Sequence, residues 1–266
     1  MTEKRKKVGL ALGSGALKGI AHIGVIKVLE ENNIPIDFIA GTSIGALVGA
    51  LYAYFQNSRI LENIVLNTDL KKGMGLLDPS LKKGLLRGQK IKNFIREHIK
   101  ANDFKNLRIP LAIVATNLKT GEAEIMKDGD LMSAIQASIS VPVIFPPVKR
   151  EGKLLIDGGM VMPVPVQPLR EMGADIVIAV NLYGALKQRQ PKRFKKIGLS
   201  FIGNRSAEIM LYQLAKRDIK EADIIIEPDV EGYNLIDFIK HRKSVLKKGE
   251  KSCQEKIEKI KRLIFD

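Results

Sequence analysis

The chain is 266 residues long, 45% of its residues are hydrophobic, and its formal net charge at pH 7 is +15. This length and hydrophobic content allow a large buried core and exclude an intrinsically disordered chain. The single cysteine, Cys253, cannot form an internal disulfide, which indicates a reducing compartment.

The first predicted element is a short buried strand, Val8 to Leu12, which follows a basic start. A glycine-rich loop comes next (GSGALKG, residues 13–19) and leads into a predicted helix, Gly19 to Glu31. Backbone N–H groups at such a loop and helix start carry partial positive charge, which suits an oxyanion or a phosphate. A basic start before an apolar run also imitates a signal peptide, but the glycines and Lys18 interrupt this run. We therefore expect a cytoplasmic protein, and no stretch of about 20 apolar residues predicts a transmembrane helix.

The second predicted strand, Ile36 to Ala40, precedes a G-x-S-x-G motif at Gly41 to Gly45 and a predicted helix, Ile44 to Phe55. Glycines on both sides of Ser43 let the backbone take a sharp strand-to-helix turn without a Cβ clash. A serine hydroxyl becomes a nucleophile when such a turn exposes it and a neighbouring base accepts its proton. Ser43 is therefore the candidate nucleophile, although small residues also cluster where helices pack closely on sheets.

Strands and helices alternate along the rest of the chain, which predicts an α/β fold with a central, mostly parallel sheet in a three-layer arrangement flanked by helices. Further strands are predicted at Leu111 to Thr116, Ile176 to Asn181 and Ile224 to Glu227, with antiparallel edge strands at Glu122 to Met126 and Val143 to Leu155. Further helices are predicted at Arg59 to Asn67, Gln89 to Lys100, Leu131 to Ser138 and Gly203 to Glu221. The segment Lys72 to Gly88 has the composition of a mobile cap near the site, and core packing is an equally good interpretation.

A third motif, Asp157-Gly158-Gly159, follows the short strand-like run Lys153 to Ile156. A carboxylate followed by two glycines lies on an open turn that another backbone or a ligand can approach. The order of strand, glycine-rich loop, helix, strand, G-x-S-x-G, helix and then Asp-Gly-Gly is far more specific than any one of its parts.

Together these motifs resemble those of the patatin-like phospholipases. Residues 12–26 (LGSGALKGIAHIGVI) resemble the glycine-rich block and following helix of that family, Gly41 to Gly45 its nucleophile elbow, and Asp157 to Gly159 its acidic motif. Pro142, Phe145 and Pro146 resemble the segment that precedes the acidic motif. One departure is that Ser14-Gly15-Ala16 stands where the family usually has three consecutive glycines.

The resemblance covers about Lys7 to Leu182. We therefore expect a single patatin-like domain over residues 1–266, with a motif-bearing core at about 7–182 and a basic helical C-terminal extension at about 187–266.

The resemblance implies a serine–aspartate dyad that hydrolyses lipid or other acyl esters without a cofactor or a metal. Ser43 would attack the ester carbonyl, and Asp157 would take its proton directly and later activate water. The amides of Ser14, Gly15 and Ala16 would stabilise the oxyanion, and removal of one such donor typically lowers the rate by about 10²- to 10³-fold. The residues that would support these motifs are Lys18, Gly19, Gly41, Gly45, Gly158 and Gly159.

Three histidines leave a Ser–His–Asp triad open, because Ser43, Asp157 and His241 follow the chain order of α/β-hydrolase triads. His22, on the helix after the glycine-rich loop, is expected to pack or cap that loop, and His98 to be a surface residue. None of the three has metal-ligand spacing.

Two other function classes also remain open. A dinucleotide-binding domain could use Gly13, Gly15 and Gly19 as a GxGxxxG variant, but it needs an acid at the end of the second strand, whereas Asp37 lies at its start. A non-catalytic module that binds lipid or a protein partner is the third class.

Basic residues cluster at 82–100, 187–196 and 240–266. Such clusters are either solvated faces or attract an anionic membrane, at around 1 kcal/mol for each well-placed cation, so peripheral membrane association is an additional expectation. Nucleic acid is an unlikely partner because the chain has no Trp, few aromatic residues and no recognisable binding module. A last predicted helix, Gln254 to Ile264, places three isoleucines (Ile257, Ile260, Ile264) on one face for docking on the body or on a membrane.

Overall fold

Eight strands of the described residues form one mixed sheet. The structure, a computed structural model, describes residues 5–67, 89–184, 198–230 and 240–266. The strands are β1 (Val8–Leu12), β2 (Phe38–Thr42), β3 (Leu111–Asn117), β4 (Ala123–Met126), β5 (Val148–Arg150), β6 (Lys153–Asp157), β7 (Ile176–Val180) and β8 (Ile224–Ile226). Their order is β5-β6-β3-β2-β1-β7-β8, with β4 also paired to β3. The strands β3, β2, β1, β7 and β8 are parallel, which confirms the expected α/β fold.

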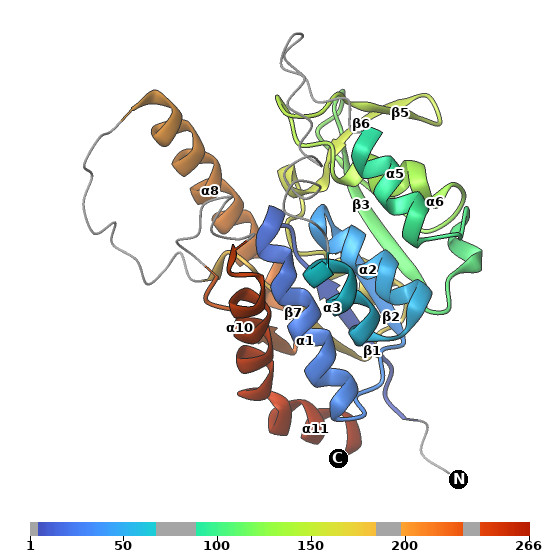
Figure 1. The fold of residues 1–266 in the computed structure, drawn as a ribbon, viewed down its shortest axis with the longest axis vertical. Helices are drawn as coiled ribbons and strands as arrows, with labels where there is room; N and C mark the ends of the chain where they lie inside the picture. Colours follow the sequence, from blue (N-terminus) through green and yellow to red (C-terminus); the bar gives the residue numbers. More distant parts are fainter. Residues whose placement is uncertain (1–4, 68–88, 185–197, 231–239) are drawn as a thin grey trace.

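Helices cover the sheet, and Figure 1 shows α1, α2, α3 and α10 in front of it. The helices are α1 (Ile20–Glu31), α2 (Ile44–Phe55), α3 (Ser58–Asn67), α5 (Gln89–His98), α6 (Leu131–Ser138), α7 (Gln167–Glu171), α8 (Leu199–Asp218), α10 (Arg242–Gln254) and α11 (Ile257–Phe265). No helix among the described residues is long and apolar enough to cross a bilayer.

Alternating large and small side chains divide the core between the two faces of the sheet. On β1, Leu10 and Leu12 join the larger core cluster, which includes residues of α1, α2, α3 and α10, whereas Ala11 joins the smaller cluster with Leu169 of α7 and Ala215 of α8. Successive strand residues point to opposite faces, so this alternation fixes which helices each face receives.

The helices α1 and α10 pack at backbone distance. A Cβ atom on Gly24 of α1 would overlap the carbonyl oxygen of Leu246, and one on Gly249 of α10 would overlap the carbonyl oxygen of Ala21. The segment beyond the motif-bearing core is thus in direct contact with the helix that follows the glycine-rich loop.

The pairing of β3 brings two distant parts of the chain together. Its first half pairs with parallel β2, up to Thr42 opposite Val114, and its second half pairs with antiparallel β6, from Asp157 opposite Ala115. Since β4 pairs with residues of both halves, β2 and β6 lie on the other edge of β3 and meet end to end. The residue after Thr42 and the last residue of β6 therefore become neighbours.

Several predicted boundaries need correction. The expected strand from Val143 is wrong at its start, because residues 142–144 form a turn and β5 begins only at Val148. The last predicted helix, Gln254 to Ile264, corresponds to α11, which begins only at Ile257, and α10 precedes it as a separate helix that was not predicted. The isoleucine face of α11 (Ile257, Ile260, Ile264) is buried against the body. The expected cap at 72–88 and the basic cluster at 187–196 lie outside the described residues.

Candidate active site

Ser43 lies on a sharp turn between β2 and α2, with φ 55° and ψ −121°. A positive φ is strained for a residue with a Cβ atom and is found mostly where the surroundings enforce it. The neighbouring glycines allow the strand and the helix to approach closely enough to hold Ser43 in this conformation. A Cβ atom on Gly45 would overlap the carbonyl oxygen of Leu12, and one on Gly41 would lie 2.6 Å from the amide nitrogen of Ala46. The strand and the helix can therefore fold back on each other only with glycine at these two positions.

The hydroxyl of Ser43 donates a hydrogen bond directly to Asp157, with 2.5 Å between Oγ and Oδ2. The other carboxylate oxygen, Oδ1, accepts the N–H of Gly159 at 2.7 Å, in the 3-10 helix Gly158–Met160. Both side chains are buried. Burial raises the pKa of Asp157 to about 6, although the hydrogen bonds from Ser43 and Gly159 oppose the shift. A carboxylate with this pKa is ionised at pH 7 and is a stronger base than an exposed one.

Two serines at the end of α6 and just after it hold this pair in place, and sequence analysis did not single them out. The N–H of Ser43 donates to Ser138 Oγ at 2.8 Å, and that hydroxyl donates to the carbonyl of Val114 at 2.6 Å. The N–H of Asp157 donates to the carbonyl of Ser140 at 2.9 Å. Two serines at the end of a predicted helix, Ser138 and Ser140, were the available signal, because short hydroxyl side chains favour bonds to nearby backbone.

The glycine-rich loop differs in one respect from the expected oxyanion cradle. The N–H of Ser14 donates to the carbonyl of Pro163 at 2.8 Å, so it is not free to bind an oxyanion in this structure. Within the described residues, the amides of Gly15 and Ala16 have no acceptor. Ala16 has φ 50°, a conformation that alanine adopts at a cost. Of the three amides expected to bind an oxyanion, Gly15 and Ala16 are thus the two that this structure leaves without an acceptor among its described residues.

His22 supports this loop from behind. Its ring is fully buried on α1, and Nε2 lies 2.8 Å from the carbonyl oxygen of Gly13, which can only accept, so Nε2 carries the proton. Nδ1 is buried with no hydrogen-bond partner. Burial lowers the pKa of His22 to about 4, although the bond to Gly13 opposes the shift, so the imidazole is neutral at pH 7. This geometry agrees with the structural role expected for His22.

Lys18 and Gly19 belong to the 3-10 helix Ala16–Gly19, which forms the end of the loop. The Lys18 ammonium stands 5.4 Å from the centre of the Tyr183 ring, and the Tyr183 hydroxyl lies 3.1 Å from Ser14 Oγ. A Cβ atom on Gly19 would overlap the side chain of Ile44, and one on Gly158 would overlap the carbonyl oxygen of Val114. Neighbouring atoms thus approach both backbone positions too closely for a residue with a Cβ atom.

The remaining reactive residues stand apart from this pair. His241 is exposed at the start of α10, and His98 Nδ1 bonds to the carbonyl of Phe94 within α5. The Ser43 hydroxyl reaches Asp157 with no imidazole between them. Cys253 is buried in α10, and burial raises its pKa to about 12, so its thiol is not a nucleophile at pH 7.

Comparison with known proteins identifies the family of the chain. A sequence model described as Patatin-like phospholipase matches residues 10–170. An uncharacterised NTE family protein of Mycobacterium tuberculosis is 39% identical over 183 residues, which are 67% of this chain and 50% of that protein. Lysophospholipase NTE1 of Coccidioides immitis is 33% identical over 198 residues, which are 71% of this chain and 12% of that protein.

The fold has a matching solved structure, VipD of Legionella pneumophila. It aligns with a TM-score of 0.59 and 14% identity over 96% of this chain and 67% of that one. The chain spans about half the length of the mycobacterial relative, and a smaller part of the fungal one. From the family match over more than half of its residues, the chain belongs to the patatin-like phospholipase family.

Proposed function

We propose that the protein is a serine acyl-ester hydrolase that acts on lipid esters through a Ser43–Asp157 dyad. The observation that carries this proposal is the 2.5 Å hydrogen bond from Ser43 Oγ to Asp157 Oδ2 on a strained strand-to-helix turn. A nucleophile in direct contact with its base satisfies the geometric requirement for nucleophilic catalysis.

In the proposed reaction, Ser43 Oγ bonds to the ester carbonyl carbon while its proton passes to Asp157 Oδ2. The tetrahedral oxyanion accepts hydrogen bonds from the amides of Gly15 and Ala16, which the structure leaves without another acceptor. Asp157 then gives its proton to the leaving alcohol oxygen as the carbon–oxygen bond breaks. A water molecule, deprotonated by Asp157, attacks the acyl-enzyme and releases the fatty acid, and Ser43 recovers its proton.

The substrate class is proposed from the family and from the relatives. The fungal relative is named a lysophospholipase, so we propose a lysophospholipid as the first ester to test. The dinucleotide alternative loses support because Asp37 is engaged elsewhere: its carboxylate accepts bonds from the Arg5 guanidinium and from the N–H of Val8. Asp37 therefore holds the start of β2 in place, and it does not lie at the end of that strand, where a ribose would need an acid.

A serine-reactive fluorophosphonate probe tests the nucleophile. We expect the probe to label the wild type and the control variant Ser252→Ala, on α10, and not Ser43→Ala. Labelling that persists in His241→Ala supports the dyad, whereas loss of labelling in that variant would favour the triad.

Hydrolysis of a panel of lysophosphatidylcholine, phosphatidylcholine, triacylglycerol and p-nitrophenyl butyrate tests the base and the substrate class. We expect Asp157→Asn to lose activity on every ester that the wild type hydrolyses. Full activity in Asp157→Asn would contradict the role of the base. If the folded wild type is not labelled by the probe and hydrolyses no ester, the alternative of a non-catalytic module that binds lipid is favoured.

A further inference from the structure

The turn at residues 142–144, between α6 and β5, presents apolar side chains to solvent. Val143 is 86% exposed and Ile144 is 40% exposed. Val143 also has φ 70°, a conformation that is strained for a β-branched residue and normally taken by glycine or asparagine. A strained backbone that displays an apolar residue is a reason to look for a function at that position.

Hydrogen bonds and prolines in the turn hold Val143 and Ile144 in their exposed positions. The N–H groups of Ile144 and Phe145 both donate to the carbonyl of Val141, at 3.2 and 2.9 Å. The Phe145 side chain is buried, so it anchors the turn from below. Proline at positions 142, 146 and 147 restricts the backbone on either side. The two exposed side chains therefore project from a closed and anchored turn.

The turn lies beside the proposed catalytic pair. The carbonyl of Ser140 accepts the N–H of Asp157, and Val143 is three residues further along the chain. Three residues span at most about 11 Å, so the Val143 backbone lies within that reach of Ser140. Met160 follows Asp157 by three residues, at the end of the 3-10 helix Gly158–Met160, and is 40% exposed. Exposed apolar side chains thus occur within three residues of Asp157 and within three residues of Ser140, its backbone hydrogen-bond partner.

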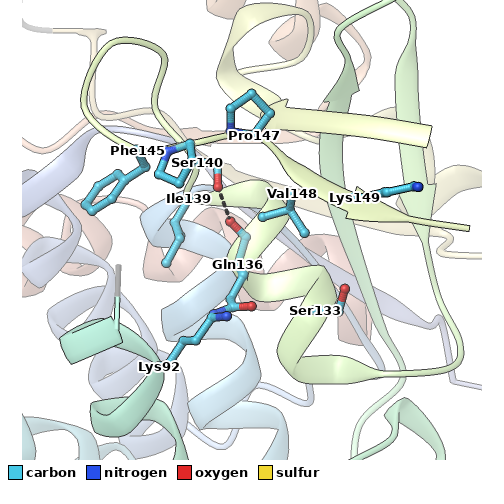
Figure 2. Close-up of a pocket in the computed structure, with 10 residues that line it drawn as sticks. Lys92, Ser133, Gln136, Ile139, Ser140, Phe145, Pro147, Val148 and Lys149 are labelled. Atoms are coloured by element: carbon cyan, nitrogen blue, oxygen red, sulfur yellow. Dashed lines mark hydrogen bonds between the residues drawn. The ribbon is translucent and has the colours of Figure 1, made fainter. Parts of the chain in front are cut away.

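A pocket with a basic rim adjoins the turn. It has a volume of about 360 Å³ and is formed by α5, α6 and the segment from Ile139 to Lys149 (Figure 2). Phe145, Pro146 and Pro147 line it on the side of the turn, and Lys92 of α5 and Lys149 of β5 contribute positive charge. None of the described residues that line it is acidic. In Figure 2 the two lysines lie on different sides of the pocket.

We propose that this turn and the neighbouring lysines form the surface by which the protein docks on an anionic lipid bilayer. Val143, Ile144 and Met160 enter the interfacial layer, and Lys92 and Lys149 bind lipid phosphate groups. This inference rests on the proposed function, because a lipid ester must leave the bilayer close to Ser43 to be hydrolysed. The docking proposal extends that function by naming the face of the protein that contacts the membrane and the residues that bind it.

A bilayer fits this surface better than a protein partner does. A stable protein interface buries roughly 800 Å² on each partner, far more than three small or medium side chains expose. Apolar side chains next to lysines are the combination that binds at the boundary between lipid headgroups and acyl chains. The chain as a whole carries a net charge of +15, which has the sign that an anionic surface attracts.

Sedimentation with vesicles tests the docking surface separately from catalysis. Every protein carries Ser43→Ala, so the lipid is not hydrolysed, and the vesicles are phosphatidylcholine with or without phosphatidylglycerol. We expect Val143→Asn with Ile144→Gln to weaken binding to anionic vesicles by roughly tenfold or more. Asparagine suits the positive φ of Val143, so this double variant is expected to fold. Phe265→Gln, on α11 at the other end of the molecule in Figure 1, is the matched control, since Phe265 is 57% exposed.

The lysines are tested on the same vesicles. We expect Lys92→Gln and Lys149→Gln each to weaken binding by about fivefold when phosphatidylglycerol is present and to have little effect on pure phosphatidylcholine. Added salt should reduce the difference between wild type and these variants, because it screens the attraction.

Three outcomes would overturn the docking proposal. These are wild-type affinity in the Val143→Asn, Ile144→Gln double variant, equal loss in the Phe265→Gln control, or self-association through Val143 without vesicle binding, measured by light scattering. Failure of the proposed function would give a different result: the wild-type protein, which retains Ser43, would hydrolyse no ester at all. With an active enzyme, the double variant should lower hydrolysis of vesicle lipid relative to hydrolysis of soluble p-nitrophenyl butyrate.

Discussion

Replacing Asp157 with asparagine should abolish hydrolysis and at the same time stabilise the folded protein at neutral pH. Asp157 is buried, and burial raises the pKa of its carboxyl from 3.8 to about 6. At about 1.4 kcal/mol for each tenfold change in proton affinity, this rise corresponds to roughly 3 kcal/mol of unfavourable charge burial above pH 6. Asp157→Asn removes the charge and keeps a side chain of the same shape that can still accept the Gly159 N–H.

The predicted stabilisation depends on pH in a defined direction. Between pH 4 and 6 the folded protein keeps the Asp157 proton while the unfolded chain has lost it, so the free energy of unfolding of the wild type falls as the pH rises through this window. The advantage of Asp157→Asn should therefore be small near pH 4 and should reach at most about 3 kcal/mol at pH 7 to 8.

Urea denaturation of the wild type and of Asp157→Asn at pH 4.5 and pH 8 measures this difference. The control variant Glu122→Gln removes an exposed carboxylate and should change stability by no more than about 0.5 kcal/mol at either pH. The reasoning is refuted if Asp157→Asn is less stable than the wild type at pH 8. It is also refuted if the difference between the two proteins is the same at both pH values.

Three further predictions concern the same site. The kcat/KM of the wild type should rise with pH and reach half of its maximum near pH 6, because Asp157 must be ionised to accept a proton; a rate independent of pH between 5 and 8 would argue against it as the base. Ser138→Ala should lower thermal stability by about 1–3 kcal/mol and reduce kcat more than it changes KM, since the buried N–H of Ser43 loses its acceptor; wild-type kcat would show that Ser138 does not position the turn. Gly45→Ala should cost about 2 kcal/mol or more in urea denaturation, because its methyl group meets the carbonyl of Leu12, and wild-type stability would mean that the turn opens freely.

Local sequence patterns were sufficient for the elements that carry the motifs. The short apolar run Val8 to Leu12 predicted β1, and the observed strand has the same limits. Helix α2 also has the predicted limits, Ile44–Phe55. The strand before the nucleophile was placed two residues too early, at Ile36 to Ala40, because Gly41 was interpreted as part of the turn. In the structure Gly41 pairs with Leu12 and Ile113, so β2 continues to Thr42.

Tertiary pairing determines the parts that local patterns did not predict. The contact between Ser43 and Asp157 joins residues 114 apart, and it depends on the register that sets Asp157 opposite Ala115 of β3. The bond from the Ser14 amide to the carbonyl of Pro163 depends on a segment that follows the last motif. No periodicity in one segment reports the register of another, so such contacts follow only from the assembled sheet.

The close packing of α10 on α1 makes the C-terminal region a brace for the proposed oxyanion loop. His22 on α1 holds the Gly13 carbonyl, and Gly24 and Gly249 let α10 press against the same helix. Enlarging either glycine would push α1 outward and pull the imidazole away from the loop. Substitutions in α10 (residues 242–254) would then lower kcat, although no side chain of α10 takes part in the proposed reaction.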